Sequence, residues 1–190
     1  MLVISFDIGI INLCVCVSLN DNIIIWKIIR LLDKCPKSLS IDLLTSNLYL
    51  NMDLLISEIK DITSHDIDSV LLENQPCKAS NNIKITQTLL YGYFYNLKHY
   101  DAFVKNIYQV SPSLKLKEFY SDVDRTGLSR PEQYKQNKKV SIQLCSEFIQ
   151  DSPRLTDMFK ECNKKDDMAD SLLMLLAWIK KHHKIQIKPC

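Results

Sequence analysis

The sequence predicts an α/β fold built on a mixed five-stranded sheet, in which three antiparallel strands are followed by two parallel ones and helices lie on both faces. Three short apolar, β-branched segments open the chain, helix-like and strand-like segments alternate after them, and no internal repeat occurs. A meander followed by alternating helices and strands implies antiparallel pairing that is then extended by right-handed parallel crossovers. With 190 residues and 46% hydrophobic content, the chain is expected to form one domain over residues 1–190.

The predicted strands are rich in Val, Ile and Leu and are bounded by turn residues. Gly9 permits a turn after the first strand, and Asn20 with Asp21 joins the second strand to the third. A fourth strand, SVLLENQP, ends at a proline, and a fifth, FVKNIYQVSP, follows a helical segment. The five predicted strands span residues 2–8, 12–19, 22–31, 69–76 and 103–112.

Apolar residues recur at intervals of three and four in the other periodic segments, which is typical of helices that bury one face. Around Gly92, in the segment YGYFY, Tyr93 and Phe94 are assigned to the core in preference to an interface. Residues 115–137 mix charge, proline and glycine without periodicity, so a mobile loop is expected there. The predicted helices span residues 41–62, 82–100, 138–149 and 163–183.

The composition argues against several classes of protein. A net charge of +2 does not indicate nucleic-acid binding by itself, so any such surface must be local. The seven cysteines form an odd set without CxxC or HxxxH spacing, which indicates reduced thiols in a cytosolic or nuclear setting and argues against structural zinc. The N-terminal apolar run lacks a basic region, and the apolar stretch 172–179 is too short to cross a bilayer. We expect a soluble protein in a reducing compartment, with no membrane partner and no small-molecule cofactor.

An aspartate stands in the first apolar strand, where an uncompensated carboxylate would cost several kcal/mol. Period-two alternation puts Asp7 near the end of one face of this strand, and the same rule puts Glu73 near the end of the strand SVLLENQP. If these strands are parallel neighbours, about 4.8 Å apart, both acids emerge at the same edge of the sheet, where α/β sheets bind ligands.

A third acidic feature opens the last predicted helix, KKDDMADSLLMLLAWIKK. Asp167 and Asp170 share one helix face, whereas the residues after Ser171 are apolar nearly all the way round, so a buried helix with its acidic end near the core is expected. Repulsion between carboxylates there has to be offset by a cation or by protonation. Asp166 lies outside the three-residue spacing and is interpreted as a solvated neighbour.

Carboxylates gathered in this way suit hard divalent cations. Mg²⁺ takes oxygen ligands, and in nucleases two ions about 3.5–4 Å apart clamp the attacking and leaving oxygens of a phosphodiester. We therefore expect Asp7, Glu73, Asp167 and Asp170 to be catalytic metal ligands for two Mg²⁺ ions, or for Mn²⁺. Each acid alone has a simpler explanation, because a strand-end aspartate is usually a turn residue and acids in the first helical turn stabilise the helix dipole.

The segments SFDIG, LLEN and KKDDMAD, in this order, resemble the ribonuclease H-like nucleases of the RuvC type, and among them the poxvirus Holliday junction resolvases. The resemblance spans nearly the whole chain. It implies a ribonuclease H-like fold and an endonuclease that resolves four-way junctions by paired symmetric nicks with 5′-phosphate and 3′-hydroxyl ends. It also implies a role in viral recombination, replication and concatemer resolution in the host cytoplasm.

The resemblance further implies that Asp7 is the central metal ligand and that a lysine at the start of the penultimate helix is catalytic. Lys138 and Lys139 both stand there, and the sequence does not choose between them. Ile10 and Ile11 depart from the family, in which polar residues are more usual at these positions.

Clustered basic residues would bind the phosphates of branched DNA without reading its sequence. A solvated surface is the simpler explanation of both clusters. Two symmetric cuts also imply a homodimer with two active sites. The two basic clusters are Lys115, Lys117, Arg125, Arg130, Lys135, Lys138 and Lys139, and Lys180, Lys181, Lys184 and Lys188.

Three other interpretations of the sequence compete with this one. A nuclease of the same fold could cleave an RNA:DNA hybrid or linear DNA, and a non-catalytic module could only bind nucleic acid. The segment FDIGIIN could also be the phosphate-binding turn of an actin-like or sugar-kinase half-domain. Such proteins need two halves, for which 190 residues leave no room.

Overall fold

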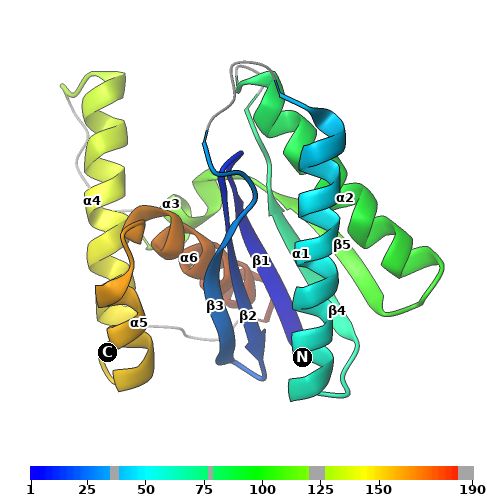
Figure 1. The fold of residues 1–190 in the computed structure, drawn as a ribbon. Coiled ribbons are helices and arrows are strands. Elements are labelled where there is room, and N and C mark those ends of the chain that lie inside the picture. The colour runs from blue at the N-terminus through cyan, green and yellow to red at the C-terminus, as the bar shows by residue number, and fades with distance from the viewer. Residues whose placement is uncertain (35–38, 77–78, 120–126, 184–190) are drawn as a thin grey trace. The chain divides into compact units, whose positions relative to one another are not determined.

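The computed structural model describes residues 1–34, 39–76, 79–119 and 127–183. The chain divides into two compact units, Met1–Ser111 and Pro112–Cys190 (Figure 1). We name the first the sheet unit and the second the helical unit, after the elements that each contains.

The sheet unit is built on five strands in the order β3-β2-β1-β4-β5. β1 pairs antiparallel with β2, and β2 pairs antiparallel with β3. β1 and β4 are parallel, as are β4 and β5, so the predicted mixed sheet is confirmed. The strands are β1 (Leu2–Ile8), β2 (Asn12–Leu19), β3 (Asn22–Arg30), β4 (Ile67–Glu73) and β5 (Val104–Val110).

A two-residue turn joins β2 to β3 at the predicted place. Asn20 and Asp21 have φ angles of 48° and 67°. Positive φ at both central residues matches a hairpin turn whose twist follows that of the strands, and Asn and Asp tolerate this conformation better than most residues do. The local sequence therefore sets the register of this hairpin.

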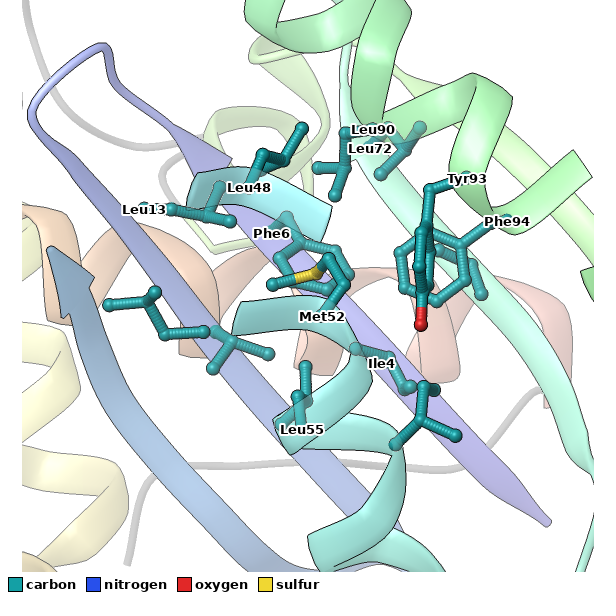
Figure 2. Packing of buried hydrophobic residues seen from close by; sticks show 14 of the residues in the cluster. Ile4, Phe6, Leu13, Leu48, Met52, Leu55, Leu72, Leu90, Tyr93 and Phe94 are labelled. Atoms are coloured by element: carbon teal, nitrogen blue, oxygen red, sulfur yellow. The ribbon is translucent and has the colours of Figure 1, made fainter. Parts of the chain in front are cut away.

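Two long helices, α1 (Ile41–Ile62) and α2 (Asn81–His99), pack on one face of this sheet and bury a continuous apolar core (Figure 2). Ile4 and Phe6 of β1 meet Met52 of α1 and Phe94 of α2 in this core. The ring centroids of Phe6 and Phe94 lie 5.4 Å apart. Tyr93 is also buried, which confirms the assignment of the central YGYFY residues to the core.

The helical unit contains α3 (Ser113–Phe119), α4 (Arg130–Ile149), α5 (Pro153–Glu161) and α6 (Lys165–His183). α6 contacts each of the other three helices. Its central residues are almost all buried, including Leu172, Leu173 and Leu175, as the apolar sequence predicts. No helix within the described ranges combines the length and apolar character needed to cross a bilayer.

The segment 115–137, expected to be a loop, is helical at both ends. α3 extends to Phe119 and α4 begins at Arg130, whereas residues 120–126 lie outside the described part of the chain. Local capping explains the early start of α4, because the Glu132 carboxylate accepts hydrogen bonds from the backbone N–H and the hydroxyl of Ser129. These bonds also lower the pKa of Glu132. The charged, aperiodic sequence concealed this helix start.

The helix α5 was not predicted, although its start carries a recognisable signal. Ser152 is its N-cap, with its hydroxyl oxygen accepting from the backbone N–H of Leu155, and Pro153 occupies the first turn. Serine followed by proline is typical of a helix start. α5 is short and buries Leu155 and Phe159, so its apolar periodicity is too brief to stand out.

Candidate active site

Asp7 and Glu73 stand at the ends of two neighbouring parallel strands. The register pairs Ser5 with Leu71 and Phe6 with Leu72, so one further step along the strands puts Asp7 opposite Glu73. Both side chains are half-buried. Because residues opposite each other in register point to the same face, two carboxylates belong to one edge of the sheet.

A tight turn follows Asp7. A Cβ atom on Gly9 would lie 2.4 Å from the backbone oxygen of Asn12, a distance that real Cβ atoms essentially never show. Glycine is therefore required for the chain to return into β2 directly behind the carboxylate.

Hydrogen bonds beyond the end of β4 hold Glu73. The side-chain amide of Gln75 donates to Oε2 of Glu73 at 3.2 Å. The backbone N–H of Gln75 donates in turn to Oε1 of Gln87 at 3.3 Å, and that of Asn74 donates to the carbonyl of Val110 at 2.8 Å. Gln75 thus orients the carboxylate of Glu73, and Gln87 of α2 holds Gln75 in place.

The helical unit presents its acidic residues at the start of α6. Asp166 and Asp167 lie in its first turn, and Asp170 lies one turn further on. All three side chains are half-buried. This placement puts three carboxylates near one helix end, where the helix dipole favours negative charge.

Lys138 of α4 pairs with Asp166, whereas Lys139 is exposed. The Lys138 ammonium lies 2.5 Å from Oδ2 of Asp166 and 5.0 Å from the ring centroid of Tyr134. Burial by itself would lower the pKa of Lys138, but the hydrogen bonds to Asp166 and Tyr134 outweigh it and raise that pKa. Asp166 was interpreted as a solvated neighbour, and this is wrong because its carboxylate is ion-paired and partly buried.

Lys115 is a residue whose role the sequence did not reveal. It was assigned to a DNA-binding surface, but its side chain is buried and its ammonium lies 2.7 Å from Oδ2 of Asp170. A signal for this role existed, because Lys115 follows shortly after β5 ends at Val110, and ligands of α/β sheets gather beyond the carboxyl ends of parallel strands. The helical unit thus supplies two lysines to its three aspartates.

The charge balance around Asp167 favours a further cation. Burial is the main reason that the pKa of Asp167 is raised, and repulsion from Asp166 and Asp170 adds to it, while Lys164 and Lys138 act in the opposite direction. A raised carboxylate pKa means that its charge is not fully compensated. Oδ1 of Asp170 is also buried and has no hydrogen-bond partner among the described residues.

These observations fit a hard metal ion, whose preferred ligands are carboxylate oxygens with open lone pairs. Within the described ranges, no group of three or more His, Cys, Asp or Glu side chains is gathered closely enough to hold a metal ion. Lysine ammonium groups compensate Asp166 and Asp170 instead. The carboxylates of the two units remain predicted ligands.

The predicted basic clusters are only partly available to DNA. Lys180 bonds to the carbonyl of Glu118 at 2.8 Å and lies 3.7 Å from its carboxylate, so it supports the packing of α3 and α6. Five other basic residues are exposed, and three lie outside the described residues. The exposed ones are Lys117, Arg130, Lys135, Lys139 and Lys181, and those outside are Arg125, Lys184 and Lys188.

The fold is similar to that of solved Holliday junction resolvases. Thermus thermophilus RuvC in complex with Holliday junction substrate matches with a TM-score of 0.61 at 13% identity, over 100% of both chains. The yeast mitochondrial Holliday junction resolvase matches with a TM-score of 0.60 at 18% identity, over 94% of this chain and 77% of that one. The fowlpox virus resolvase, in complex with Holliday junction DNA, matches with a TM-score of 0.52 at 22% identity, over 95% and 98% of the two chains. The ribonuclease H-like fold of the RuvC type is therefore confirmed.

The sequence is similar to viral proteins in two comparisons. An uncharacterized protein of Acanthamoeba polyphaga mimivirus is 25% identical over 130 residues, which is 63% of this chain. The chain spans about a third of the length of that relative, of which 31% is matched. The family model described as "Poxvirus A22 protein" matches residues 1–182. The chain therefore belongs to the poxvirus A22 protein family.

Proposed function

We propose that this A22-family chain is a divalent-metal-dependent endonuclease that resolves four-way DNA junctions by paired symmetric nicks, leaving 5′-phosphate and 3′-hydroxyl ends. Family membership and a fold shared with three Holliday junction resolvases support this proposal. The proposal includes a role in viral DNA recombination, replication and concatemer resolution in the host cytoplasm. Residues 1–190 would act as a single nuclease domain.

The register that sets Asp7 opposite Glu73 is the observation that carries the proposal. Carboxylate oxygens at one edge of the sheet are the ligands that hard divalent cations prefer. Asp7, Glu73, Asp167 and Asp170 would hold two Mg²⁺ ions, with Mn²⁺ as a substitute. When bound, such ions polarise the phosphodiester and neutralise the charge that develops on its oxygens.

The lysines of the helical unit would position the acids and hold charge near the substrate. Lys115 fixes one oxygen of Asp170 and leaves the other open. Lys138 neutralises Asp166, so the neighbouring Asp167 meets less repulsion. Its high pKa keeps Lys138 protonated, and so able to donate to a phosphate oxygen. Lys139, which is exposed, would contribute at most a phosphate contact.

Two cuts at symmetric positions require two active sites, so we propose a homodimer that binds one branched DNA molecule. Exposed basic residues such as Lys117 and Lys135 would contact phosphates and make the affinity fall steeply with salt. Such contacts read the shape of the junction without reading its bases.

Cleavage of matched substrates tests the proposal. Purified protein with Mg²⁺ is incubated with a synthetic four-way junction, a linear duplex and an RNA:DNA hybrid. We expect paired nicks in opposite strands of the junction, and loss of these nicks on chelation of the metal. Preferential cleavage of the hybrid or of linear DNA would support a different nuclease of the same fold.

Two variants and a control complete this test. Asp7→Asn and Asp170→Asn keep the shape of each side chain but remove its charge, and we expect each to lower the cleavage rate by about a hundredfold or more while junction binding persists. Asp151→Asn changes an exposed aspartate in a turn and should cleave like the wild type. Wild-type cleavage by Asp7→Asn would exclude the proposed metal site, and binding without any cleavage by the wild type would favour a non-catalytic module.

A further inference from the structure

We propose that a pocket beside Glu73 receives one unpaired nucleotide of the branched DNA, next to the phosphodiester that is cut. This inference rests on the proposed function. The pocket lies wholly within the sheet unit and has a volume of ≈ 430 Å³. It is lined by Asn74, Gln75, Lys84, Gln87, Thr88, Tyr91 and Gln109.

The lining has the chemistry that recognises a nucleotide. Four of the seven side chains are amides, from Asn74, Gln75, Gln87 and Gln109. An amide offers a donor and an acceptor side by side, which matches the edge of a base, as in the bidentate pairing of Asn or Gln with adenine. The side chains of Asn74 and Gln109 are exposed and so available to a ligand, whereas Gln75 and Gln87 already take part in hydrogen bonds within the protein.

Tyr91 and Lys84 add the two other contacts that a nucleotide needs. Tyr91 of α2 is 37% exposed, so part of its ring is available to stack on a base, an interaction that tolerates any base identity. Lys84 lies about two helical turns earlier on the same pocket wall and suits a phosphate. The volume falls within the range of small-ligand pockets and is too small for a base pair with its backbones.

The hydrogen bonds of Gln75 connect this pocket to the predicted metal ligand Glu73. Gln75 lines the pocket, and its side-chain amide donates to Oε2 of Glu73 at 3.2 Å. Its backbone N–H is held by Oε1 of Gln87, a pocket residue that is 9% exposed. A nucleotide in the pocket would therefore contact Gln75, whose side-chain amide bonds to the predicted metal ligand Glu73.

A branched substrate supplies an unpaired nucleotide at low cost. A base inside a linear duplex must break its pair and its stacking before it can enter a pocket, at a cost of a few kcal/mol that is smallest where pairing is already disturbed. Strand exchange disturbs stacking at the centre of a four-way junction. The pocket would thus favour cutting at the branch point and add a dependence on the base next to the cut.

Single-turnover cleavage of a set of four-way junctions tests the pocket. In each junction, one nucleotide flanking the cut is replaced by an abasic site. We expect one position at which the abasic site lowers the wild-type rate about fivefold or more, which is the loss of one base stacked on an aromatic ring. Equal rates at every position would overturn the inference.

Tyr91→Ala is the diagnostic variant, and Tyr100→Ala is its matched control. Tyr100 stands at the C-terminal end of α2, is 81% exposed and does not line the pocket. We expect Tyr91→Ala to slow cleavage of the intact junction about fivefold or more and to abolish the abasic effect. Tyr100→Ala should keep both the rate and the abasic effect, and identical behaviour of the two variants would contradict the assignment.

Affinity measurements separate this inference from the proposed function, because they need no cleavage. Fluorescence anisotropy without divalent ions gives the dissociation constants of the intact and abasic junctions for the wild type and for Tyr91→Ala. A nonadditive effect of the two changes supports the pocket even if the wild type never cleaves DNA. Cleavage with purely additive effects would refute the pocket and leave the nuclease proposal standing.

Discussion

The ammonium nitrogen of Lys115 lies 2.7 Å from Oδ2 of Asp170, and both side chains are largely shielded from solvent, with 10% and 25% of their surface exposed. The pair joins α3 to α6 within the helical unit. Removing one partner of a buried ion pair costs more than the pair itself contributes, because a desolvated charge is left behind. Asp170 is also the residue whose other oxygen has no hydrogen-bond partner within the described ranges.

Replacing Lys115 by Met should therefore destabilise the protein. We expect Lys115→Met to lower the free energy of unfolding by about 2–3 kcal/mol, below the full cost of a completely buried pair because Asp170 keeps some contact with water. Urea denaturation followed by circular dichroism measures this change. Lys117→Met, on the same helix but exposed, should stay within about 0.5 kcal/mol of the wild type, and an equal loss in both variants would contradict the role of the pair.

Loss of Lys115 should also change the response to metal. If Asp170 is a metal ligand, Mg²⁺ can compensate its charge once the ammonium is gone. We expect the rise in melting temperature on adding Mg²⁺ to be larger for Lys115→Met than for the wild type, because a ligand that binds only the folded state stabilises it. Equal shifts would argue against Asp170 as a ligand.

Lys138 and Lys139 are neighbours with opposite environments, so they form a natural pair of variants. Lys138→Ala removes the partner of Asp166 and should lower the junction-cleavage rate about tenfold or more, because Asp166 then adds repulsion beside Asp167. Lys139→Ala, at an exposed position, should change the rate less than about threefold. The rates are compared at saturating DNA, and a larger effect at Lys139 would reverse the assignment.

Two glycines predict opposite effects of the same substitution. Gly9→Ala would place Cβ 2.4 Å from the Asn12 backbone oxygen and should lower the free energy of unfolding by about 1–3 kcal/mol. On Gly92, in the middle of α2, the added Cβ would meet only the Tyr49 hydroxyl at 3.7 Å, an ordinary contact. Gly92→Ala should therefore stabilise the protein by about 0.5–1 kcal/mol. Thermal denaturation measures the stability of both variants relative to the wild type. A Gly9→Ala variant as stable as the wild type would contradict the close approach of the backbone in the turn after Asp7.

Asp68 predicts a pH dependence of stability. Burial alone would raise the pKa of Asp68, but the bond from Lys105 and the bond from the Leu2 backbone N–H, both 2.7 Å long, lower it below the usual value. A carboxyl whose folded-state pKa is lowered stabilises the fold above its unfolded pKa of about 4, and this contribution disappears as the pH falls through the folded-state value.

Asp68→Asn should accordingly be less stable than the wild type at pH 7, by less than about 1 kcal/mol because the ion pair is partly exposed. The difference should shrink below about pH 4 as the wild-type carboxylate becomes protonated. Urea denaturation at several pH values measures it. Asp61→Asn, at an exposed position of α1, should show no such trend, and a constant difference across pH would contradict the lowered pKa.

Periodicity was enough to predict the sheet unit. Alternation of period two over short β-branched runs, turn residues between them, and apolar spacing of three and four in α1 and α2 are all local properties. The same local rules placed Asp7 and Glu73 at strand ends. They also predicted antiparallel pairing followed by parallel crossovers, whereas the order β3-β2-β1-β4-β5 comes from the structure.

What the tertiary structure alone decided is which charges meet. Lys115 looked like one of many surface lysines, and only the packing of α3 against α6 brings it to Asp170. Likewise the choice of Lys138 over Lys139, and the pairing of Asp166, depend on the rotation of α4 about its axis, which its weakly amphipathic sequence does not determine. The spacing of apolar residues along the chain is enough to predict secondary structure. An ion pair between two helices depends instead on the relative orientation of those helices, and the packing of many side chains determines that orientation.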